Sequence, residues 1–124
     1  MDLKERAKNS IDVQAEKALN RYVSYGPAQL MLSLEKSEQA TDFIANGYPN
    51  DLSNYPFINA ESIATGKTPK EVADAIILKK SEWIAIATQI EEKRLKAKKD
   101  IDNAVDDVNV LDIRKNAIEE LENI

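Results

Sequence analysis

The sequence has no cysteine and no histidine. Without cysteine, the chain forms no disulfide and offers no thiolate to a metal. Without histidine, it lacks the commonest general base near neutral pH and the commonest protein ligand of transition metals. We therefore expect a protein that is not an enzyme, with no catalytic residues, no cofactor, no metal and no small-molecule substrate.

Long apolar runs and an excess of positive charge are missing too. No run approaches the roughly 18–20 apolar residues that span a bilayer, and Met1–Ser10 lacks the apolar stretch of a signal peptide. The formal net charge of −5 opposes nucleic-acid binding, because that affinity comes largely from Lys and Arg displacing counterions. We expect synthesis in the cytoplasm and neither a membrane nor a nucleic-acid partner.

Glycine and proline are scarce, with 3 and 4 copies in 124 residues, and they are grouped in a few places. Long stretches without them favour long helices. A chain of this length matches one domain, and 43% hydrophobic residues supply a core. The prediction is an all-α single domain over residues 1–124, built from helical hairpins as an elongated or coiled-coil-like bundle.

The first predicted part is a helical hairpin over residues 1–46. A helix over Asp2–Tyr25 is indicated by inward residues spaced by three or four, namely Leu3, Ala7, Ile11, Ala15, Ala18 and Tyr22. Gly26 and Pro27 end this helix and start a second one. The second helix is expected to turn inward the residues Leu30, Leu34, Ala40, Phe43 and Ile44.

Residues 47–67 are predicted to form a linker with one short helix. Residues 46–56 combine turn-forming residues with two Tyr-Pro pairs, and the residue before a proline disfavours helical geometry. A short helix over Pro56–Thr65 follows, with Gly66 just beyond its end. It is expected to bury Phe57, Ala60 and either Ile63 or Ala64.

A long amphipathic helix over about 69–103 dominates the predicted C-terminal part, residues 68–124. Thr68 is placed to cap backbone amides, Pro69 suits the first helical position and Glu71 completes a capping box. A seam close to a heptad repeat then runs through Val72, Ile76, Trp83, Ala87, Ile90, Arg94, Ala97, Ile101 and Ala104. Such a helix is about 50 Å long at 1.5 Å per residue, so part of it is expected to project from a domain of this size.

The seam loses clarity near Val105–Asp107. Either Asp106 or Asp107 can cap a last helix that carries Val108, Leu111, Ala117, Ile118 and Leu121. This break makes a second hairpin. One continuous helix is the alternative, because no glycine or proline lies between Lys70 and Ile124.

Two polar groups invite a chemical interpretation that their spacing does not support. Residues 65–68 contain the Gly-Lys-Thr of a phosphate-binding loop, but that loop needs glycine where Glu61 stands. A divalent cation would suit the carboxylates of Asp100, Asp102, Asp106 and Asp107, but the run lacks the glycine-containing pattern of a Ca²⁺ loop. We interpret both groups as helix ends.

The residues around the long helix are expected to be structural in most cases. The basic cluster over residues 93–99 alternates with acidic residues, which favours pairs between Glu91 and Arg94 and between Glu92 and Lys96. The end of a small core is the expected place of Tyr22, Tyr25, Tyr48 and Tyr55.

The seam supplies the candidate interface: Trp83, Ile90, Arg94 and Ile101. Trp83 is either a core residue or an anchor for a partner, since tryptophan is enriched among residues that dominate binding energy. Arg94 interrupts the apolar seam, so it snorkels, pairs with a carboxylate or sets the register of an oligomer. A projecting seam favours a homo-oligomer, with a dimer as the default.

A family resemblance adds a biological context. The residues that carry it are Tyr25, Gln29, 38–40, 55–58, 65–68, 72–73, 76–77, Lys80, Trp83, 90–91, Arg94, Lys98, Asp100 and Ile101. Over roughly residues 22–104 the chain resembles helical tail-associated proteins of bacteriophages and prophages, which are tail-fibre segments or accessory and assembly proteins. The resemblance implies a place in or around the virion tail and other tail proteins as partners, and it implies no reaction.

The expected function is therefore noncatalytic. The chain is predicted to be a phage or prophage tail-associated structural or assembly protein, made in the host cytoplasm, that acts through helix-mediated protein-protein contacts. A cytosolic regulatory or adaptor helical bundle unrelated to virions is the alternative.

Overall fold

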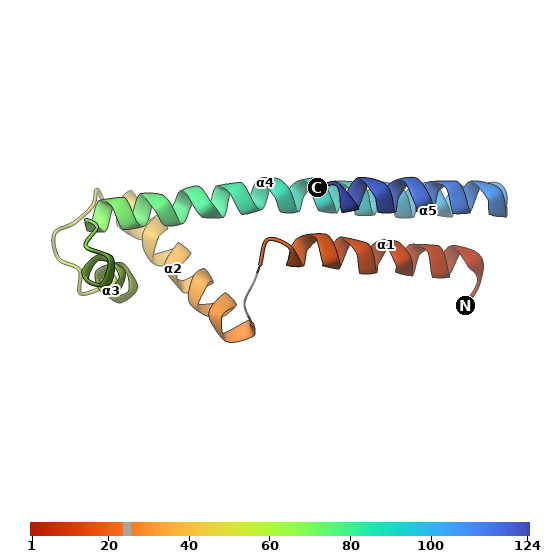
Figure 1. Cartoon of the computed structure of the whole chain (residues 1–124). Coiled ribbons are helices and arrows are strands. Elements are labelled where there is room, and N and C mark those ends of the chain that lie inside the picture. Colours follow the sequence, from red (N-terminus) through yellow and green to blue (C-terminus); the bar gives the residue numbers. More distant parts are fainter. Residues whose placement is uncertain (24–25) are drawn as a thin grey trace. The chain divides into compact units, whose positions relative to one another are not determined.

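The computed structural model describes residues 1–23 and 26–124, and within these ranges it contains helices and no strand (Figure 1). The helices are α1 (Leu3–Asn20), α2 (Pro27–Ala45), α3 (Pro56–Thr65), α4 (Pro69–Asp102) and α5 (Asp107–Glu122). The all-α prediction is confirmed. The first helix is shorter than expected because it ends at Asn20. The predicted end at Tyr25 lies outside the described residues.

Local capping interactions set the boundaries of the last two helices. Thr68 Oγ1 accepts a hydrogen bond from the Glu71 amide at 3.1 Å, which is the predicted start of α4. The Asp106 side chain accepts from the Asn109 amide at 2.8 Å and begins α5. The predicted break after the long helix is therefore confirmed, and the continuous helix is excluded.

Gly66 ends α3, as the sequence indicates. Its φ of 75° lies in the left-handed region, and its amide donates to the Ser62 carbonyl at 3.0 Å. A side chain at this position would strain the backbone, which is why glycine suits the residue after a helix end.

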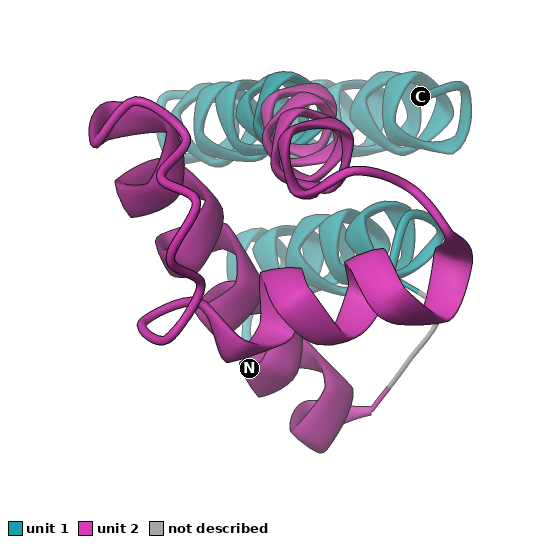
Figure 2. Cartoon of the chain, turned by 90° about the vertical axis from the view of Figure 1, so that its left-hand side faces the viewer, with its two compact units in different colours: residues 1–24, 84–124 teal, residues 25–83 magenta. Residues whose placement is uncertain are grey.

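Contacts divide the chain into two compact units (Figure 2). Unit 1 contains residues 1–24 and 84–124, and unit 2 contains residues 25–83. Within unit 1, α1 packs against α5, and within unit 2, α2 packs against α3. The single domain over residues 1–124 with an N-terminal hairpin over residues 1–46 stays a prediction. The contact of α1 with α5 joins segments far apart in the sequence, which is possible because the free-energy cost of closing a loop grows only slowly with its length.

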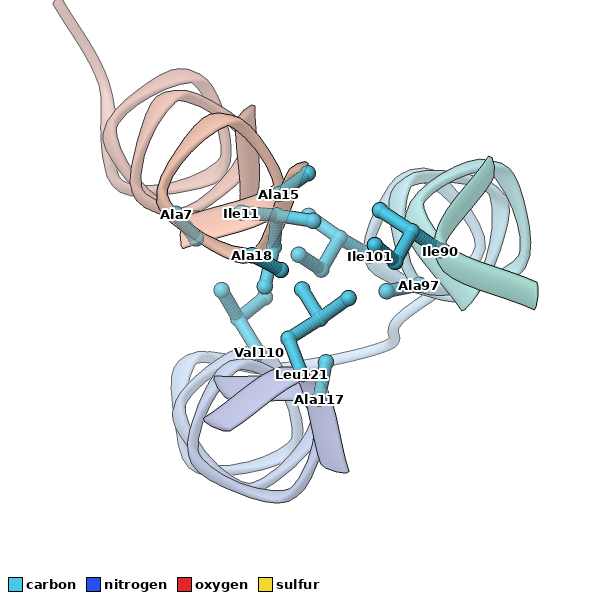
Figure 3. Close-up of a cluster of buried hydrophobic side chains, with 10 residues drawn as sticks. All are labelled: Ala7, Ile11, Ala15, Ala18, Ile90, Ala97, Ile101, Val110, Ala117 and Leu121. Carbon is cyan, nitrogen blue, oxygen red and sulfur yellow. The ribbon is translucent and has the colours of Figure 1, made fainter. Parts of the chain in front are cut away.

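Unit 1 has a three-sided core between α1, the second half of α4 and α5 (Figure 3). The predicted stripe of α1 is buried at Ala7, Ile11, Ala15 and Ala18. Its small alanines let the helices approach closely, while Ile11 fills the space between them. Tyr22, expected on the same stripe, is exposed because α1 ends before it.

The inward face of α5 differs from the prediction. Val110, Ala117 and Leu121 are buried at spacings of seven and four, which is one face of a helix. Val108 and Leu111 are exposed because they lie off this stripe. The sequence of α5 has apolar residues on more than one face, and the contact with α1 determines which face is buried.

Unit 2 has its own core, formed by Ala40, Phe43, Tyr55, Ile58, Val72 and Ala73. The ring of Phe43 meets those of Tyr55 and Tyr48 edge to face, at centroid distances of 5.1 and 5.6 Å. Tyr55 O–H donates to Asp42 Oδ2 at 2.6 Å. The role predicted for Tyr55, at the edge of a small core, is confirmed.

The short helix α3 buries a different residue from those predicted. Ile58 is fully buried, Phe57 is half-buried, and Ala60, Ile63 and Ala64 are exposed. The second half of α3 contacts α2 through the ion pair between Glu61 and Lys36, whose Nζ lies 2.6 Å from Glu61 Oε1, so its apolar residues stay exposed. Buried Gln39 of α2 positions the first turn of α3, because its Oε1 accepts from the Phe57 amide at 3.0 Å.

Candidate interaction surface

Two of the four seam candidates are buried within the chain. Ile90 and Ile101 belong to the core of unit 1, covered by α1 and α5. They therefore present no surface to a partner in this structure, and their part in the candidate interface is corrected. The prediction treated the seam as a single exposed surface, but its C-terminal half is buried at Ile90, Ala97 and Ile101 in the core of unit 1.

Trp83 remains accessible, with 41% of its surface exposed. Leu78 on the same helix is also exposed. An exposed tryptophan is a favourable anchor for a partner because its large ring buries much apolar area at little entropic cost. Trp83 thus stays a candidate interface residue.

Arg94 joins α4 to α1 through carboxylates. Its Nη1 donates to Asp12 Oδ1 at 2.9 Å, and its Nη2 and Nε donate to the two carboxylate oxygens of Glu91 at 2.8 and 3.0 Å. Lys98 also contacts Asp12, at 3.0 Å. The expected Glu91–Arg94 pair is confirmed, and the planar guanidinium explains why one residue serves both carboxylates.

The electrostatics of this network favour its charged state. Burial opposes the ionisation of Asp12, but hydrogen bonds from Lys98 and Arg94 outweigh it and hold the pKa of its carboxyl below the ordinary value. The hydrogen bond from Arg94 likewise lowers the pKa of Glu91. The network fixes the register of α1 against α4, so Arg94 has a structural use inside unit 1.

A second bridge between the same helices involves Asp102. Lys8 Nζ donates to Asp102 Oδ1 at 2.8 Å, and Lys4 Nζ donates to the Asp102 carbonyl at the end of α4. Lysines at a helix C-terminus are favoured by the helix dipole. Asp102 and Asp106 therefore lie at helix ends, as their sequence positions indicate. The part of the chain that the structure describes holds no cluster of three or more carboxylates suited to a metal.

A groove of about 520 Å³ lies between α4 and α5 in unit 1. Ala97 and Ala117 line it, and charged residues form its rim. Lys93 pairs with Glu120 across it, and Lys96 pairs with Asp100 instead of the predicted Glu92. Because these lysines already have carboxylate partners, the groove offers little to an anionic ligand.

The surface that sequence reasoning missed lies on α2. Pro27, Leu30, Met31 and Leu34, which we call the outer stripe, are all exposed. The prediction that Leu30 and Leu34 point inward is therefore wrong. The first turns of α2 extend away from α3 and from the start of α4 (Figure 1), so only the second half of the helix, at Gln39, Ala40 and Phe43, reaches the core.

A signal for this surface was present in the sequence. Residues 22–34 contain no charged side chain, whereas 31% of the whole chain is charged. A helix segment that is exposed and yet lacks charge departs from the ordinary solvated helix face. The outer stripe and Trp83 are therefore candidate apolar contact features of the described surface.

Comparisons with known proteins gave no relative: no family model matches the chain, and neither the curated proteins nor the solved structures contain a match. None of the described helices has the length and apolar character needed to cross a membrane.

Proposed function

We propose that this chain is a noncatalytic protein that acts by helix-mediated contacts with other proteins, and that its place is the tail of a bacteriophage or prophage, as a structural or assembly component. The single observation that carries the contact role is the outer stripe of α2, where Leu30, Met31 and Leu34 are exposed at 43%, 71% and 59%. Apolar side chains grouped in this way favour association because burying them against a partner removes them from water.

The tail assignment rests on the sequence resemblance over residues 22–104. Two observations agree with a protein that binds rather than catalyses. The sequence has no histidine or cysteine, and the ion pairs Lys8–Asp102, Arg94–Asp12 and Lys98–Asp12 join α1 to α4. A cytosolic regulatory or adaptor bundle is the second candidate, since exposed Trp83 and the outer stripe would suit an adaptor equally well.

Fractionation of assembled particles tests the proposal. The tagged chain is expressed in a lysogen of the encoding prophage, particles are induced and purified, and the tag is followed through whole virions, free tails and tail intermediates. We expect the chain in at least one of these fractions, and we expect Met31→Glu to reduce its recovery there, with Ile63→Glu as the matched control. Absence of the wild-type chain from all three fractions would favour the adaptor instead.

A further inference from the structure

The outer stripe of α2 faces away from the residues that hold this helix in unit 2. Gln39, Ala40 and Phe43 anchor α2 to the core. At about 100° per residue, Leu34 lies on the opposite side of the helix from Phe43, and Met31 lies about 120° around the helix axis from it. Packing within unit 2 therefore does not account for the apolar character of the stripe.

We propose that the outer stripe binds the same stripe on a second copy of this chain, with the two α2 helices antiparallel. The spacing of Pro27, Leu30, Met31 and Leu34 reads the same in both directions along the helix. A two-fold contact uses the same patch on both copies, so a stripe with this symmetry suits it. A two-fold axis perpendicular to the helices, placed between Leu30 and Met31, relates the two copies. It brings Leu34 of one copy opposite Pro27 of the other.

Charge complementarity supports the antiparallel direction. The N-cap of α2 is Gly26, which makes no side-chain capping bond, and the first turn holds no acidic residue. The N-terminal end of a helix carries a partial positive charge, which favours a negatively charged group beside it. The same rotation brings the exposed carboxylate of Glu35 opposite Gly26 of the second copy.

We infer a second copy as the occupant because this one helix supplies every group that the contact needs. Each α2 supplies an apolar stripe, a helix N-terminus and, nine residues beyond Gly26, the carboxylate of Glu35. A parallel pair would instead bring the two positive N-termini together and leave Glu35 of each copy away from them. This inference deepens the proposed contact role, and it is tested on the purified chain, so it can fail while the association with tails holds.

Solution mass over a range of concentrations gives the first test. We expect a concentration-dependent dimer for the wild-type chain by size exclusion with light scattering. Met31→Glu is expected to raise the dimer dissociation constant by at least about tenfold, because it removes apolar contact and brings two carboxylates together at the two-fold axis. Ile63→Glu, an equally exposed apolar position on α3, is expected to leave the constant unchanged.

Single-cysteine variants test the direction of pairing, since the chain has no cysteine of its own. Met31→Cys lies beside the proposed axis, so its two copies are expected to form a disulfide-linked dimer under mild oxidation. The two copies of Leu34→Cys would lie about 10 Å apart along the helices, which is too far for a disulfide. Circular dichroism confirms that both variants keep the wild-type helix content.

Three outcomes would overturn the proposal. One is a wild-type chain that stays monomeric at every concentration, which would mean that another occupant covers the stripe. Another is a dimer that Met31→Glu weakens no more than Ile63→Glu does. The third is equal cross-linking by Met31→Cys and Leu34→Cys, which would contradict the antiparallel geometry.

Discussion

Arg94 shows how a polar residue is accommodated on an otherwise apolar seam. Its guanidinium reaches Asp12 of α1 and Glu91 of its own helix, so the charge is paired instead of being buried alone. The side chain is 29% exposed, so water screens the pair only in part. A charge in this position stabilises one register of α1 against α4, because sliding either helix by a turn would leave Asp12 without Arg94 and Lys98.

Replacing Arg94 tests this role. We expect Arg94→Met to lower the free energy of unfolding by about 1–2 kcal/mol, because it removes charge-assisted hydrogen bonds to two carboxylates and leaves Asp12 with Lys98 alone. Urea denaturation measures the change. Lys96→Met, whose side chain is far more exposed on the same helix, is the matched control and is expected to behave as wild type. Equal effects of the two substitutions would contradict a special role for Arg94.

Asp12 predicts a loss of stability in acid. Its pKa in the folded protein lies below the ordinary value of 3.8, so the unfolded chain binds a proton more readily than the folded one. The stabilisation from this carboxylate is complete above the unfolded pKa and is lost as the pH falls through the folded pKa. The urea midpoint, measured from about pH 5 to about pH 2, is expected to fall less steeply in Asp12→Asn than in wild type. The same slope in both proteins would assign the acid sensitivity to other carboxylates.

At the level of helices, α5 offers a direct test of which face is buried. Val110 is 1% exposed and Val108 is 69% exposed, so one helix provides the same residue type in both environments. Val110→Ala is expected to lower the free energy of unfolding by about 2 kcal/mol, because it removes two buried methyl groups. Val108→Ala is expected to change it by less than about 0.5 kcal/mol. Thermal or urea unfolding of the pair decides the matter, and the reverse order would mean that α5 packs through its other face.

Helix boundaries were predictable from local chemistry, whereas helix faces were predictable only in part. Thr68, Asp106 and Gly66 act on backbone groups within a few residues, so their effect is present in the sequence itself. The face of α1 was also clear, because its polar residues leave one apolar stripe. Both α2 and α5 carry apolar residues on more than one side, and only the tertiary partner decides which side is buried.

For the candidate interface too, the local contacts were predictable from the sequence and the tertiary contacts were not. Arg94 could be identified from its interruption of the seam, and its pairing with Glu91 from their separation of three residues. Its contact with Asp12 depends on the approach of α1, which no local pattern predicts. The outer stripe was assigned to the core, because an apolar residue at helical spacing is usually buried and the sequence does not show where a helix leaves its partners.

The residues that the structure describes form two cores that share no buried residue. One lies between α1, the second half of α4 and α5, and the other joins α2, α3 and the start of α4. The segment that builds unit 2 is continuous, whereas unit 1 is assembled from both ends of the described chain. A small core that is complete within one continuous segment can open without disturbing the other.

Native-state hydrogen exchange tests this independence. Ile58→Ala removes a fully buried side chain from unit 2 and is expected to cost about 2–5 kcal/mol there. Exchange should then accelerate in α3 and in the second half of α2, while the amides of α1 and α5 keep their wild-type protection, because their core contains none of the same residues. The reciprocal variant Ile11→Ala should accelerate α1 and α5 and spare α3. If Ile58→Ala accelerates α5 as much as α3, the continuous helix α4 transmits unfolding between the units, and the molecule unfolds as one cooperative whole.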